Sequence, residues 1–191
     1  ALYDPVTGSW TATSAMLAAR SRHTATLLSS GRLLVAGGHA PGGLPRPDAE
    51  LYDPTTRTWT STAAMKNARE SHTATLLHSG KVLVAGGVGP SGPLAASELY
   101  DPAAGQWTST ASLGLARAEH TATLQPSGRI LVAGGAAAGG GATASTETYD
   151  PLTGRWTPAA PLSTARARHT ATLLPSGETL VTGGLGPLCS A

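Results

Sequence analysis

The residues with most chemical potential are histidines that recur at a fixed spacing. Of six histidines, four open a His-Thr-Ala-Thr-Leu segment, and they are His23, His72, His120 and His169. Four imidazoles at equivalent places of a ring could face one another and bind a transition metal. No carboxylate or cysteine recurs beside them to support such a site. We therefore expect no metal, and favour a hydrogen bond from each histidine to the backbone of a neighbouring unit.

Arginines and glutamates recur in step with these histidines. The arginines are Arg20, Arg69, Arg117 and Arg166, and the glutamates are Glu50, Glu98 and Glu147. Four arginines on one rim could attract a carboxylate or a phosphate. Pairing with the glutamates would instead offset the cost of burying charge, and we favour that structural role. A small-ligand or metal site at a channel mouth, built from the His and Arg rings, is the alternative.

Three other motifs recur at the same spacing as the histidines, and together they establish an internal repeat. Tyr-Asp-Pro begins at Tyr3, Tyr52, Tyr100 and Tyr149, in steps of 49, 48 and 49 residues. Trp-Thr begins at Trp10, Trp59, Trp107 and Trp156. The paired glycines are Gly37-Gly38, Gly86-Gly87, Gly134-Gly135 and Gly183-Gly184.

Each unit is predicted to form four short strands, a to d. In one unit, strand a runs from His23 to Leu28, a Ser-Gly turn follows, and strand b is the apolar run from Leu33 to Gly37. A continuous apolar run is typical of a strand buried on both faces. Strand c is Glu-Leu-Tyr-Asp, which proline ends, and strand d begins at tryptophan. The paired glycines are expected to let these aromatic rings approach closely.

One such meander cannot bury both its faces, so radial stacking into a β-propeller is expected. The prediction is an all-β fold with four four-stranded blades in a single domain, residues 1–191. The blades are expected at residues 1–16 plus 169–184, 17–65, 66–113 and 114–162.

The phase of the repeat predicts a 2+2 strand closure between the chain ends, because the sequence starts at strand c and stops after strand b. One chain could close a four-bladed ring, or two chains could exchange halves as a strand-exchanged homodimer with eight blades. A longer array with further blades is a third possibility. Since Ala1 lies inside a repeat, we expect a processed, excised or engineered boundary.

The order Arg, His, Gly-Gly, Glu-x-Tyr-Asp-Pro and Trp resembles a kelch repeat. It is most similar to the variant of bacterial kelch and galactose-oxidase-like domains, over essentially the whole sequence. Ala1 in place of glutamate and Thr182 in place of alanine are departures. The resemblance implies that the arginine and the acid pair near a blade interface. It also favours an extracellular or cell-surface location over the cytoplasm, because such bacterial domains are often exported.

The sequence lacks the catalytic motifs of several known enzyme classes. A galactose-oxidase-like copper site needs a cysteine crosslinked to a tyrosine, but the one cysteine is Cys189 in the tail, and every tyrosine belongs to a Tyr-Asp-Pro. Nucleophile-elbow, P-loop and zinc-protease motifs are also missing. We therefore expect no enzyme and no cofactor. All eight aromatic residues belong to the repeat, which argues against a lectin.

The charge and hydropathy patterns reduce the number of possible partner classes. The formal net charge is +2 and no run of Lys or Arg forms a stripe, so nucleic-acid binding is not expected. No apolar stretch reaches the roughly 18 residues that membrane insertion requires.

The b–c connections differ between copies, whereas the a–b and c–d turns are nearly constant. If strands alternate, b–c and d–a connections share one face, and loops are where scaffolds place function. The b–c connection richest in chemical groups holds His39, Arg46 and Asp48. The sequence thus favours a non-catalytic scaffold for protein–protein interaction or assembly through this face. A propeller fragment or engineered scaffold without an evolved ligand is a further alternative.

Overall fold

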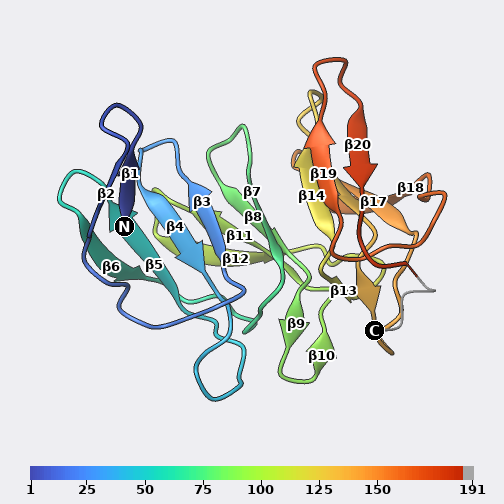
Figure 1. Cartoon of the computed structure of the whole chain (residues 1–191). Helices are drawn as coiled ribbons and strands as arrows, with labels where there is room; N and C mark the ends of the chain where they lie inside the picture. Colours follow the sequence, from blue (N-terminus) through green and yellow to red (C-terminus); the bar gives the residue numbers. More distant parts are fainter. Residues whose placement is uncertain (187–191) are drawn as a thin grey trace.

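The computed structural model describes residues 1–186, and these residues form strands and turns without any helix. Three complete antiparallel sheets of four strands follow one another along the chain (Figure 1). Blade 1 contains β3 (Thr24–Leu27), β4 (Leu33–Ala36), β5 (Ala49–Asp53) and β6 (Thr58–Thr62). Blade 2 contains β7 (Thr73–Leu76), β8 (Val82–Ala85), β11 (Ser97–Asp101) and β12 (Gln106–Thr110). Blade 3 contains β14 (Thr121–Leu124), β15 (Ile130–Ala133), β17 (Thr146–Asp150) and β18 (Arg155–Ala159).

Shorter sheets complete the described chain. Two-stranded sheets stand at its two ends, one formed by β1 (Leu2–Asp4) with β2 (Ser9–Thr11) and one by β19 (Thr170–Leu173) with β20 (Thr179–Thr182). We call these the half-blades. Two further pairs lie in the connections between strands. β9 (Val88–Gly89) pairs with β10 (Gly92–Pro93) within one b–c connection, and β13 (Arg117–Ala118) of a d–a connection pairs with β16 (Ala136–Ala137) of a b–c connection.

The local sequence explains the order of strands within a blade. Strand pairing follows the predicted a–b–c–d meander, with Tyr100 opposite Val82 on one side and Trp107 on the other. The Ser-Gly turns close the a–b hairpins, and Gly80 adopts the positive φ of 80° that such a turn requires. In the c–d turn the Asp101 carboxylate accepts a hydrogen bond from the Ala103 amide. Each hairpin is thus specified by residues within the repeat.

The hydrophobic core lies between blades, because neighbouring sheets pack face to face. Strand β8 is buried along its whole length, as predicted for a continuous apolar run between two sheets. Between blades 1 and 2 the core includes Leu34, Met65, Val82 and Tyr100. The innermost strands β3, β7, β14 and β19 lie side by side in that order. The blades therefore radiate from one row of strands, as in a propeller.

The closing ladder predicted between the chain ends is not formed within this chain. In the described residues β1 pairs only with β2, and β20 pairs only with β19. The physical reason is visible in Figure 1, where the successive blades form an open fan and the two half-blades stand at its opposite ends. The segments 1–16 and 169–184 therefore do not make one blade here. Exchange between two chains and a longer array remain predictions.

Among the described residues, no helix has the length and apolar character that crossing a membrane would require.

Candidate functional site

The strands present two faces of different character (Figure 1). The a–b and c–d hairpin turns project from one face, which we call the turn face. The opposite face, which we call the connection face, carries the b–c connections (residues 37–48, 86–96 and 134–145) and the d–a connections (12–23, 63–72, 111–120 and 160–169). The b–c connections are held in place, because His39 pairs with Ser21 and Pro45, and β9 pairs with β10. These backbone pairings therefore fix the shape of the connection face.

Three of the four repeat histidines link one blade to the next. The imidazole Nε2 of His72 lies 2.9 Å from Thr24 Oγ1, in the preceding blade. His120 and His169 make the equivalent contacts, at 3.0 Å, with Thr73 and Thr121. The partner is thus a threonine hydroxyl of strand a, and the predicted backbone partner was wrong.

Burial keeps these imidazoles neutral. Burial first, and the nearby charge of Arg69 second, lower the pKa of His72 to about 3. The pKa of His120 is also lowered to about 3, first by burial and then by Arg117. Within residues 1–186 no group of three or more His, Cys, Asp or Glu side chains is arranged to hold a metal ion. Cys189, the residue on which the copper-site prediction turned, lies outside the described residues.

In blades 1 to 3 the first glycine of the pair makes room for the repeat histidine that follows that blade. A Cβ atom on Gly86 would lie 2.5 Å from the Arg117 carbonyl oxygen and 2.8 Å from His120 Cε1. The sequence predicted that aromatic rings would pack on these glycines, but the imidazole occupies that space. The aromatic residues pair with each other instead, with the rings of Tyr100 and Trp107 centred 4.9 Å apart.

Three of the four repeat arginines form buried ion pairs. The Nη2 atom of Arg69 lies 2.8 Å from Glu98 Oε1, and both side chains are almost completely buried. The other Nη atom donates to the carbonyl oxygens of Gly86 and Ala96. Burial lowers the pKa of Arg69, and the bond to Glu98 opposes that shift. Arg20 pairs with Glu50 and Arg117 with Glu147 in the same way. These guanidinium groups are not available to an external anion.

The fourth copy differs from the other three. Arg166 donates from Nη1 to the Gly183 carbonyl oxygen at 2.7 Å, but no carboxylate within residues 1–186 pairs with it. A Cβ atom on Gly183 would meet nothing within 4 Å. The repeat residues around the half-blade of β19 and β20 thus lack the neighbours that their equivalents have in blades 1 to 3.

A row of strained residues runs across the connection face, one immediately before each repeat histidine. These residues have positive φ although none is glycine, and they are Arg22 (53°), Ser71 (50°), Glu119 (55°) and Arg168 (57°). The amide of Ser71 donates to the Arg22 carbonyl, Glu119 to Ser71, and Arg168 to Glu119, at 3.0 to 3.1 Å. We call these four residues the axial row. Such strain costs about 1 kcal/mol or more per residue and is typical of functional positions.

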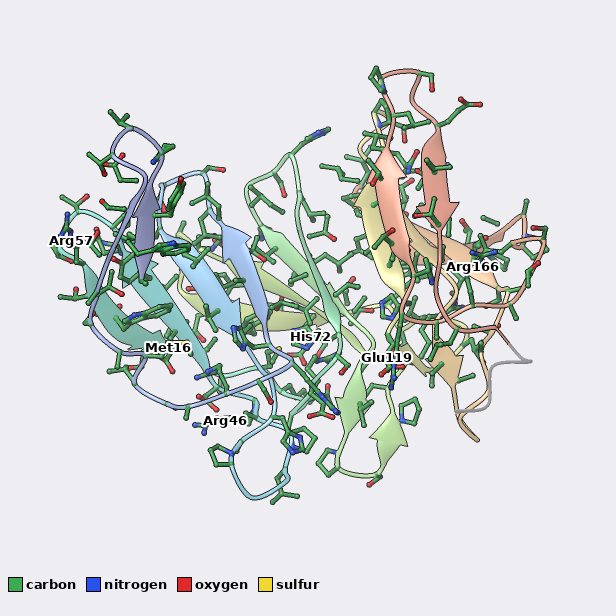
Figure 2. All side chains as sticks on the ribbon, in the orientation of Figure 1. Met16, Arg46, Arg57, His72, Glu119 and Arg166 are labelled. Atoms are coloured by element: carbon green, nitrogen blue, oxygen red, sulfur yellow. The ribbon has the colours of Figure 1, made fainter. Side chains whose placement is uncertain are left out.

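Charged side chains of the axial row project to solvent. The side chains of Arg22 and Arg168 are each 62% exposed. Arg168 Nη2 lies 2.8 Å from Glu119 Oε1, and Arg22 Nη1 lies 3.1 Å from Glu70 Oε1. Figure 2 shows Glu119 and Arg46 on the side of the molecule that carries the connections. The sequence held a signal for this row, since Arg, Ser, Glu and Arg occupy the position just before a His-Thr-Ala-Thr-Leu segment that is identical in all four copies.

The three candidate residues of the 39–48 loop differ in the partners of their side chains. His39 Nδ1 contacts Glu70 Oε2, so His39 and Arg22 share one nearly buried carboxylate. Arg46 pairs with Asp48 at 2.8 Å, and Asp48 also pairs with Arg20 at 2.6 Å. Asp48 therefore supports the buried arginine in addition to facing solvent. Glu70, which joins the loop to the axial row, was missed because no other copy has an acid at that position.

Comparison with known proteins gives one result. The family model described as the KLHDC2/KLHL20/DRC7 Kelch-repeats domain matches residues 1–184. No curated protein matches the sequence at a significant level.

Proposed function

Because the chain belongs to the kelch-repeat family, whose domains generally mediate protein–protein interaction, we propose that it binds a protein partner through the connection face. The contact is centred on the axial row and on the neighbouring 39–48 loop. The domain acts as a non-catalytic scaffold, with no reaction assigned to any residue. The single observation that carries this proposal is the axial row, because strained backbone is maintained in four successive copies there while the side chains differ.

The chemistry of this surface suits a protein segment that bears carboxylates. Arg22, Arg46 and Arg168 extend from three different connections, and each pairs with one carboxylate group. The partner of Arg22 is the nearly buried Glu70, whereas the partners of Arg46 and Arg168 are partly exposed. Exposed ion pairs contribute little to stability, so a partner's carboxylate can replace Glu119 or Asp48 at small cost. His39 and Glu70 fix the orientation of Arg22 beside the loop.

The alternative of a ligand or metal site built from the His and Arg rings has no support in the geometry. His72 and His120 are buried and bonded to threonine, and the repeat arginines of blades 1 to 3 are bonded to glutamate. No specific observation favours self-assembly over a foreign partner.

The test uses a random peptide library displayed on phage and selected against the chain. Selected peptides are then titrated against two double variants, R22S/R168S on the connection face and R32S/R129S on the turn face. All four arginines are exposed and each pairs with one carboxylate, so the two variants are matched. We expect the first variant to weaken binding about tenfold and the second to leave it unchanged.

Equal affinity for both variants, or loss only with R32S/R129S, would overturn the choice of face. A repeated failure to select any acidic peptide would favour a scaffold without an evolved ligand.

A further inference from the structure

A second candidate site lies on the opposite face of the molecule. A cavity of about 670 Å³ opens between the hairpin turns of blades 2 and 3. Residues 77–79, 81 and 99 of blade 2 and residues 127–129 and 150–152 of blade 3 line it. Its volume lies within the roughly 300 to 1,000 Å³ that small-molecule sites span. We propose that this cavity binds a small organic anion with an apolar body.

The apolar body has a matching surface. Leu77 is buried at the inner wall, and Leu99 is half-buried beside it. Leu152 lies at the rim with 97% of its surface exposed, which is unusual for a leucine that forms one wall of a cavity. A flat or chain-like apolar group between these side chains would remove leucine surface from water. Such burial contributes about 25 cal/mol for each Å².

The charge of the lining favours an anion. His78, Lys81 and Arg129 face the cavity with one carboxylate, that of Asp150. Arg129 contacts Asp150 at 3.3 Å, and Lys81 contacts Asp101 at 3.0 Å, both in exposed settings. Exposed pairs of this kind are weak, so an oxyanion can recruit both cations. His78 also lines the cavity, and an imidazole N–H can donate a hydrogen bond to an oxyanion.

The same place between blades 1 and 2 provides an internal comparison. The cavity there measures about 250 Å³, below the range of small-molecule sites. Ser29 stands where blade 2 has His78, and Ala103 stands where blade 3 has Leu152. Both positions vary among the copies, and the larger cavity lies where they hold His78 and Leu152.

The experiment titrates 2-naphthoate into the ¹⁵N-labelled chain and follows amide chemical shifts. We expect saturable shifts at Leu77, Ser127 and Leu152. The double variant R129A/L152S should weaken binding about tenfold, because it removes one cation and one apolar wall. The matched variant R32A/V6S removes an equivalent exposed arginine and an equivalent exposed turn residue elsewhere, and it should leave binding unchanged.

Three results would overturn the proposal. They are equal losses in both variants, equal affinity for the uncharged 2-naphthol, and shifts confined to exposed apolar residues of the half-blades such as Trp10 and Leu180. Because the cavity lies on the turn face, its failure would leave the proposed partner site on the connection face untouched.

Discussion

Arg69 joins two blades through different atoms of one residue, and Glu98 fixes its side chain. The Arg69 carbonyl oxygen accepts a hydrogen bond from Gly38 of blade 1 at 2.8 Å, while its guanidinium lies 2.8 Å from Glu98 in blade 2. Glu98 also accepts from the amides of Lys66 and Asn67, at 2.7 and 3.0 Å. The buried ion pair of Arg69 and Glu98 therefore holds the connection between blades 1 and 2 in place.

Replacing Arg69 by methionine should strongly destabilise the chain. Glu98 would remain buried without its cation, and breaking a buried pair by removing one partner costs about 3 to 5 kcal/mol. Arg166→Met is the matched control, because Arg166 has no carboxylate partner within residues 1–186. Urea denaturation should show a loss of about 1 kcal/mol or less for the control. Similar losses in both variants would show that the ion pair does not stabilise the fold.

Replacing Gly86 by alanine should also destabilise the chain. The added Cβ would lie 2.5 Å from the Arg117 carbonyl oxygen, and the backbone has a φ of 61°. Gly183→Ala has nearly the same backbone strain, with a φ of 70°, but nothing within 4 Å of the new atom. The control should cost about 1 to 2 kcal/mol, and Gly86→Ala should cost about 2 kcal/mol more. Equal unfolding free energies would contradict the proposed packing of glycine against the next blade.

The buried histidines predict a pH dependence of stability. His72 and His120 have pKa values lowered to about 3 in the folded chain, so the unfolded chain binds more protons between pH 6.5 and 3. The free energy of unfolding should therefore fall as pH falls, by up to about 1.4 kcal/mol per pH unit for each histidine.

The measurement is urea denaturation between pH 6 and 4.5, above the range in which aspartates titrate. His120→Gln should reduce the slope of stability against pH. Thr73→Val breaks the same hydrogen bond but removes no titratable group, so it should lower stability without changing the slope. An unchanged slope in His120→Gln would refute the buried neutral state.

The axial row predicts a stabilising substitution. Ser71 has a φ of 50°, and glycine relieves the strain that a Cβ causes there, so Ser71→Gly should raise the unfolding free energy by about 0.5 to 1 kcal/mol. Ser61→Gly, in the exposed strand β6, should lower it by a similar amount because glycine weakens a strand. Destabilisation by both changes would mean that the axial backbone is not strained.

Much of the fold could be predicted from the sequence because each blade is specified locally. The apolar run of β8, the Ser-Gly turn and the tyrosine–tryptophan register all follow from residues within one repeat. Closure could not be predicted in the same way, since it depends on small rotations between blades that no residue encodes alone. The single-chain ladder between residues 1–16 and 169–184 was therefore expected but is not formed.

The candidate site was predicted only in part. His39, Arg46 and Asp48 lie on the expected face, but the second role of Asp48 beside Arg20 depends on a contact 28 residues away in sequence. Positive φ values at Arg22 and Glu119 cannot be read from residue types that rarely adopt them. Glu70 contacts His39 and Arg22, which are distant from it in sequence, so its role could not be predicted from its own segment.

The central claim is that a protein partner binds the connection face. It is tested most directly by the amide chemical shifts of the ¹⁵N-labelled chain on addition of a library-selected peptide. The account predicts that shifts gather at Arg22, His39, Ser71, Glu119 and Arg168, and that R22S/R168S removes them. Shifts that gather instead at the hairpin turns around Gly31, Gly80 and Gly128 would contradict it.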